Sequence, residues 1–208
     1  MSINVVVLGA AGRTGRLIVA EALHNGHRVT AAVRNPASVP RSPGLRVQRA
    51  DVRDADSLRA VIEGHDAVVS AIGAAGRKAN NLYSDGARAT VSAMRAGGVD
   101  RLLAITSVGV RPDDPHHAWW YRSLVRPVGA DLYADMARME HIVRDSGLDW
   151  TFVRPTYLQD RESTGSYRVT DDSTPEGGWR ITRTDVARFI VEELDGHRWS
   201  RQAPGLAE

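Results

Sequence analysis

The chain has 208 residues, 42% of them hydrophobic and 25% charged, with a formal net charge of +2, so we expect one globular domain over residues 1–208. The absence of cysteine excludes disulfides, thiolate catalysis and cysteine-based zinc sites. The absence of a signal peptide, and of any apolar run near the roughly 20 residues that span a bilayer, fits a cytoplasmic protein without membrane contacts. The arginines are scattered among acidic residues, which favours a solvated mixed-charge surface over a nucleic-acid-binding one.

Strand-like and helix-like segments alternate from the start of the chain to about residue 154. Apolar runs predict strands at 3–8, 28–33, 45–50, 66–72, 101–107 and 150–154. Helical spacing of apolar residues predicts helices at 14–25, 54–63, 82–96 and 132–145, and a short strand at 166–170 precedes a last helix at 185–194. This alternation is typical of a Rossmann-like doubly wound parallel sheet with helices on both faces, in three α/β/α layers.

Two segments interrupt the alternation. Residues 108–130 contain several prolines and aromatic residues, and residues 156–178 are mostly polar. Both follow predicted strands, so both emerge at the carboxyl edge of the sheet, where open α/β sheets bind ligands. We expect these segments to form the wall of a substrate site.

Three glycines spaced three apart, Gly9, Gly12 and Gly15, join the first predicted strand to the first predicted helix. A phosphate at such a junction meets backbone N–H groups and the positive end of the helix dipole. The alternative is a tight turn without a ligand. The predicted pyrophosphate cradle consists of Gly9, Ala11, Gly12, Arg13, Thr14 and Gly15.

The end of the second predicted strand bears on which dinucleotide binds. An acid at that point binds the ribose 2′-hydroxyl of NAD, whereas a 2′-phosphate needs a cation. Here the strand is followed by Arg34, and Arg13 in the glycine loop could reach the same phosphate. The sequence therefore favours NADP(H) over NAD, although Arg34 could also be one of the many scattered arginines.

Two further stretches suit the rest of the cofactor. Asp51 and Val52 follow the third predicted strand, where the acid could accept from the adenine amino group and the valine could flank the ring. Small residues after the fourth strand leave room for a ribose, in the stretch Ala71, Ile72 and Gly73. An aspartate after a strand is also a common turn or helix-cap residue.

Five stretches spread over the whole chain carry a family resemblance. They are GAAGRTG at 9–15, AAVR ending at Arg34, ADV at 50–52, SGLDWTFVRPT at 146–156 and ITRTDVARFI at 181–190. Together they resemble the atypical short-chain dehydrogenases/reductases, the NAD(P)H-binding group that includes the NmrA-like proteins. Within this group, residues 85–107, 138–148 and 164–170 are most similar to flavin reductase/biliverdin-IXβ reductase.

A departure from the better-known short-chain dehydrogenases supports that choice within the group. Those enzymes use a Tyr-x-x-x-Lys pair, but Tyr133 here is followed four places later by Ala137. The sole lysine, Lys78, lies in a predicted loop and cannot replace it by spacing. The usual alcohol-dehydrogenase proton relay is therefore not expected, and the flavin reductase pattern also lacks this lysine.

The resemblance implies roles for residues that follow the fifth and sixth predicted strands. Ser107 matches a serine that faces nicotinamide and substrate, and Arg154, Pro155 and Thr156 lie where the family holds the nicotinamide carboxamide. Tyr157 replaces a histidine, so a phenol with a pKa of about 10 stands where the family has an imidazole with one of about 6.5. Tyr157 could still donate a hydrogen bond or stack on a flat substrate.

The aromatic residues Trp119, Trp120 and Tyr121 have two interpretations: a stacking platform for a planar acceptor, or a loop anchored in the core by its aromatic rings. The adjacent His116 and His117 point apart and lack a third ligand at usable spacing, so no metal site is expected.

The resemblance implies a monomeric NADPH-dependent reductase of planar conjugated acceptors such as flavins or bilins. Alternatives are a non-catalytic NmrA-like NADP(H) sensor, a quinone-type reductase or an epimerase.

Overall fold

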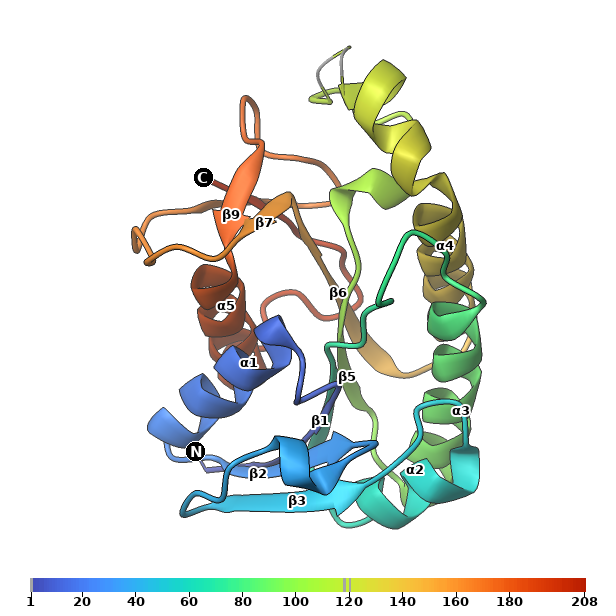
Figure 1. The fold of residues 1–208 in the computed structure, drawn as a ribbon, viewed down its shortest axis with the longest axis vertical. Coiled ribbons are helices and arrows are strands. Elements are labelled where there is room, and N and C mark those ends of the chain that lie inside the picture. The colour runs from blue at the N-terminus through green and yellow to red at the C-terminus, as the bar shows by residue number, and fades with distance from the viewer. Residues whose placement is uncertain (1, 118, 120) are drawn as a thin grey trace.

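An eight-stranded sheet runs through the molecule in the order β3-β2-β1-β4-β5-β6-β10-β8 (Figure 1). The structure is a computed structural model that describes residues 2–117, 119 and 121–208. The strands of this sheet are β1 (Asn4–Leu8), β2 (Arg28–Val33), β3 (Leu45–Arg49), β4 (Ala67–Ser70), β5 (Arg101–Ile105), β6 (Asp149–Pro155), β8 (Arg168–Thr170) and β10 (Gly205–Ala207). Neighbouring strands pair in parallel except for β8, which is antiparallel to β10. A separate parallel ribbon is formed by β7 (Tyr157–Gln159) and β9 (Arg180–Thr182).

Helices cover both faces of the sheet (Figure 1). The α-helices are α1 (Arg13–His24), α2 (Ala55–Ile62), α3 (Leu82–Gly97), α4 (Ala130–Arg144) and α5 (Arg183–Gly196). Shorter turns of helix lie at Pro36–Ser38, Val108–Val110, Tyr121–Val125 and Arg126–Gly129. The α/β three-layer Rossmann fold expected from the sequence is thus confirmed. Within the described ranges, none of the helices is long and apolar enough to cross a bilayer.

The first strand shows why the sheet is covered on both sides. Val5 and Val7 belong to the apolar cluster under α1 and α5, whereas Val6 and Leu8 belong to the cluster under α2, α3 and α4. Because successive side chains of a strand point to opposite faces, a continuous apolar run can be buried only between two layers of helices.

Helix starts and stops follow local chemistry. The carboxylate of Asp54 accepts hydrogen bonds from the first-turn amides of α2, and the Thr182 hydroxyl accepts one from the Asp185 amide of α5. Helix α3 ends where Gly98 takes a φ of +67°, a conformation that glycine adopts without strain.

The sequence did not indicate three strands: β7, β9 and β10. Each has three residues, too few to show an alternation of apolar and polar side chains. The segment 156–178 is therefore less irregular than expected, because its first residues form β7. The segment 108–130 consists largely of turns and short helices that pack outside the sheet.

Candidate functional site

The glycine loop lies at the first strand-to-helix junction, where glycine is required at two positions. Gly9 has a φ of +75°, and a Cβ there would lie 2.6 Å from the carbonyl oxygen of Ala71, the residue that follows β4. A Cβ on Gly15 would clash with the Gly9 carbonyl, so only glycine lets α1 start this close to the loop. Gly12 is the N-cap of α1, and its amide donates to the Gly9 carbonyl at 2.9 Å.

The start of α1 is open to an anion. In the described structure no side chain caps the helix at Gly12, and the first turn contains no acidic residue. The first amides of an α-helix lack partners within the helix and carry the positive end of its dipole. A phosphate group can supply the missing acceptors, so the loop fits the pyrophosphate of a dinucleotide.

The sheet order brings the other predicted cofactor residues to the same edge. Because β1 lies between β2 and β4, the residues that follow these strands flank the glycine loop: Arg34, Ala71, Ile72 and Gly73. Asp51 and Val52 follow β3, one strand further out. Asp51 is exposed and its carboxylate accepts the Arg53 amide at 3.0 Å, so it also shapes a turn. Ile72 and Val52 pack against the core cluster under α2 to α4.

The two arginines proposed for the 2′-phosphate differ in their surroundings. Arg34 is exposed, and no hydrogen bond or ion pair joins it to the described residues. Arg13 instead forms an ion pair with Asp160, just after β7. Asp160 also accepts from Arg183 at 2.7 Å. Of these two arginines, Arg34 is therefore the one left available among the described residues, and Arg13 links the glycine loop to the β7–β9 ribbon.

Residues assigned to the nicotinamide end have their side chains engaged in the fold. The half-buried Ser107 hydroxyl accepts the Gly109 amide at 3.2 Å and caps the turn Val108–Val110. The Thr156 hydroxyl donates to the Leu206 carbonyl at 3.1 Å. The Arg154 guanidinium is buried in ion pairs with Glu140 and Asp172, both at 2.6 Å. The Arg154 amide also donates to the Pro204 carbonyl at 2.9 Å, so both the side chain and the amide of Arg154 are engaged in the fold.

Tyr133, excluded as half of a Tyr-x-x-x-Lys pair, lies near the end of β5. Its ring lies between two glycines, since a Cβ on Gly109 or Gly129 would lie 2.5 or 2.8 Å from it. The Tyr121 hydroxyl donates to the Tyr133 hydroxyl at 3.3 Å. Burial, and then this hydrogen bond, raise the pKa of Tyr121 above its ordinary value.

Helix geometry places Tyr133 beyond the carboxyl edge. Glu140, seven residues further along α4, accepts a hydrogen bond from Thr106 just after β5. Residues seven apart lie on the same stripe of an α-helix, about two turns from each other. Tyr133 lies on the same stripe of α4 as Glu140, about two turns nearer to the start of the helix. Because Glu140 is level with the strand ends, Tyr133 lies beyond them, near Ser107 and Gly109. Sequence spacing offered no sign of this, because it depends on the helix packing.

The two predicted wall segments are joined to each other. The Asp114 carboxylate accepts the Thr174 amide and hydroxyl at 2.7 and 2.8 Å, and His116 bonds to the Thr174 carbonyl at 2.6 Å. Arg111 pairs with Asp172 at 3.0 Å. Burial opposes the charge of Asp114, but the hydrogen bonds from His116 and Thr174 outweigh it and hold the pKa of Asp114 below its ordinary value. The wall is therefore one connected structure.

The large exposed apolar side chains of the described residues all lie on these segments or one residue beyond: Trp119, Leu124, Val128, Tyr157 and Trp179. Trp119 is 76% exposed, so it does not anchor its loop in the core. Tyr121 is half-buried against Tyr133 and the His117 ring, as the anchoring interpretation expects. Trp120 lies outside the described residues. Trp179 was not among the predicted substrate-site residues, because it lies one residue past the predicted wall.

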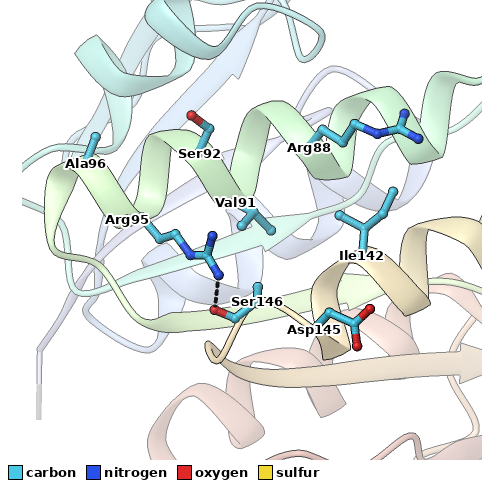
Figure 2. Close-up of a pocket in the computed structure, with 8 residues that line it drawn as sticks. All are labelled: Arg88, Val91, Ser92, Arg95, Ala96, Ile142, Asp145 and Ser146. Atoms are coloured by element: carbon cyan, nitrogen blue, oxygen red, sulfur yellow. Dashed lines mark hydrogen bonds between the residues drawn. The ribbon is translucent and has the colours of Figure 1, made fainter.

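Two surface cavities lie away from this edge. One, of about 570 Å³, lies between α3 and the end of α4, where Arg95 donates to the Ser146 carbonyl at 2.6 Å (Figure 2). Arg88, Ser92 and Asp145 add further polar groups to its lining. The other, of about 560 Å³, lies at the opposite edge, around Thr30 and His65. Neither touches the glycine loop.

The sheet, the open helix start and the glycine loop define a Rossmann-type dinucleotide-binding protein. The chain belongs to the NAD(P)H-binding family, whose profile matches residues 9–197. The uncharacterized protein YwnB of Bacillus subtilis is 30% identical over 204 residues, which cover 91% of each chain.

Solved structures agree with this assignment. A candidate NADH-flavin reductase from Streptococcus pneumoniae, SP1627, is 25% identical with a TM-score of 0.78, over 100% of both chains. A short-chain dehydrogenase/reductase from Veillonella parvula in complex with NADP has a TM-score of 0.86 at 16% identity and covers 100% of this chain and 95% of its own. The second likeness shows the shared fold alone.

Proposed function

We propose that the protein is an NADPH-dependent reductase that transfers hydride to a planar conjugated acceptor, such as a flavin or a bilin-like compound. The observation that carries this proposal is the gathering of exposed large apolar side chains on the two segments at the carboxyl edge. Exposed apolar side chains that gather in one region mark a surface for a ligand or partner, and a flat apolar acceptor would cover them. The candidate NADH-flavin reductase from Streptococcus pneumoniae supports the same substrate class.

Different residues at the carboxyl edge would bind different parts of the cofactor. The glycine loop and the amides of α1 would hold the pyrophosphate, and the exposed Arg34 would bind the 2′-phosphate that distinguishes NADPH. The backbone of Pro155 and Thr156, at the end of β6, would hold the carboxamide. When bound, the nicotinamide supplies the hydride, and the protein supplies orientation and a proton.

Three hydroxyl groups could move or hold the proton. Tyr133 accepts a hydrogen bond from Tyr121, which leaves its own hydroxyl hydrogen free to point at an acceptor. Ser107 would position the acceptor beside the nicotinamide, and the exposed Tyr157 would border it on the other side. We infer that Tyr133 donates the proton and that Tyr121 holds the Tyr133 side chain in place.

The experiment is a direct assay of NADPH oxidation with FMN, dichlorophenolindophenol, a quinone and a bilin as acceptors. We expect turnover with at least one planar acceptor and faster turnover with NADPH than with NADH. Tight binding of NADPH without turnover of any acceptor would overturn the reductase and favour an NADP(H) sensor.

A further inference from the structure

Two exposed aromatic side chains lie next to each other where the β7–β9 ribbon begins, since Tyr157 is the first residue of β7 and Trp179 directly precedes β9. The rings of Tyr157 and Trp179 are nearly parallel, 18° apart, with their centroids 6.5 Å from each other. Tyr157 remains 67% exposed and Trp179 52% exposed. Together they present an apolar aromatic surface to solvent, which is the kind of surface on which a planar ring system stacks.

The ribbon that carries this surface is anchored to the core. The Tyr157 amide donates to the Trp179 carbonyl at 3.1 Å, and Leu158 pairs with Ile181 in the ribbon. Ile181 is fully buried in the cluster under α1 and α5, and Leu158 packs against that cluster. The Arg180 guanidinium lies 5.2 Å from the Trp179 ring centroid and so steadies the indole. Because the backbone is anchored, ligand stacking has only the two side chains left to order.

The ribbon borders the cofactor loop. At one end, Tyr157 follows the end of β6 by a single residue, whose amide bonds to the Leu206 carbonyl at 3.0 Å. At the other end, Asp160 forms its ion pair with Arg13 of the glycine loop. The β7–β9 ribbon and the 121–129 segment are separate from each other at this end of the molecule (Figure 1).

We propose that Trp179, together with Tyr157, is the surface on which the ring system of the acceptor stacks, and that the ligand class is a planar heteroaromatic such as isoalloxazine. The proposal rests on the proposed reductase function for its chemistry, but not for the binding itself. Trp119 is the competing platform; in contrast to Trp179, no ring contact joins it to the described residues.

The test is a binding titration with lumiflavin, the isoalloxazine ring without a phosphate, in the presence of NADP⁺. Stacking of a base on an aromatic side chain contributes about 1–3 kcal/mol, so Trp179→Ala should raise the Kd of lumiflavin about tenfold or more. Trp179→Phe should keep most of the affinity, and Trp119→Ala, which removes the competing platform, should lose much less affinity than Trp179→Ala. The Kd of NADPH should be unchanged in each variant, which also confirms that the variants fold.

Other outcomes overturn the proposal. A loss of lumiflavin binding in Trp119→Ala, with none in Trp179→Ala, would place the acceptor on the other segment. Absence of lumiflavin, FMN and biliverdin binding to the unmodified protein would remove the ligand class altogether. Lumiflavin binding that depends on Trp179 without any oxidation of NADPH would support this surface while refuting the reductase, so the two proposals fail separately.

Discussion

At the residue scale, cofactor choice depends on the side chain that follows β2. Arg34 is exposed beside the glycine loop, and the strand order fixes it there. Arg34→Glu should raise the Kd of NADPH about 100-fold, because hydrogen bonds to a charged group contribute about 1.5–3 kcal/mol and the new carboxylate repels the phosphate. The Kd of NADH should change by less than about threefold, since a carboxylate can bind the ribose hydroxyl.

Fluorescence titration of both dinucleotides measures this difference. Arg28→Glu is the control, because it makes the same charge change on an exposed residue at the opposite end of β2. Equal weakening of NADPH and NADH by Arg34→Glu would refute its contact with the 2′-phosphate.

The proton donor is the second question at this scale. Tyr133→Phe keeps the ring between Gly109 and Gly129 but removes the hydroxyl, so the fold and the NADPH affinity should be retained. Turnover should fall about 100-fold, the lower end of the usual contribution from a positioned acid. Steady-state rates measured beside NADPH titrations check both expectations. Unchanged turnover in Tyr133→Phe would exclude Tyr133 as the donor.

Ser107→Ala, which removes one hydrogen bond, should lower turnover by about tenfold at most.

At the element scale, the sequence predicted long elements well and short ones poorly. The helices and the strands from β1 to β6 lie within about two residues of the predicted bounds, because periodic burial recurs several times within each. The strands β7, β9 and β10 have no such repetition, and each depends on a partner far away in the chain.

The candidate site divides in the same way. The glycine loop and Arg34 could be predicted because their chemistry depends on neighbours in sequence. The contacts of Tyr133, Asp160 and Trp179 could not, because they arise where α4 or the β7–β9 ribbon meets another element.

The link between α1 and the β7–β9 ribbon makes a prediction about these elements. Exposed ion pairs contribute only about 0–1 kcal/mol, so a dinucleotide phosphate can displace Asp160 from Arg13. Asp160→Asn removes a negative charge beside the phosphate site and frees Arg13. The Kd of NADPH should therefore fall about threefold, and the part of the gain that comes from freeing Arg13 should disappear in an Arg13→Ala background.

Titrations at low and high salt separate this charge effect from a change of structure, since salt screens exposed charges. Asp171→Asn, an exposed acid in the same segment, should leave NADPH affinity unchanged. Weaker NADPH binding by Asp160→Asn would instead mean that Asp160 positions Arg13 for the phosphate.

At the scale of the whole molecule, buried polar bonds join the two wall segments above a sheet whose faces are both closed. His117 lies in this junction with 4% of its side chain exposed, and neither ring nitrogen has a hydrogen-bond partner among the described residues. Burial lowers the pKa of His117 below 6.5, Arg126 and Arg122 lower it further, and Asp114 opposes them. Tyr121 contacts the same ring.

The lowered pKa values of His117 and Asp114 predict that the fold loses stability in acid in two steps. A histidine with a lowered folded pKa binds its proton more readily when unfolded, so stability should fall as the pH drops below about 6.5. The lowered pKa of Asp114 stabilises the fold above about pH 4, and this contribution should be lost as the pH falls through the folded value. Thermal unfolding from pH 8 to 3 should show both steps. His117→Gln should remove the upper step alone and Asp114→Asn should weaken the lower one. An upper step of the same size in His117→Gln would mean that another group causes it.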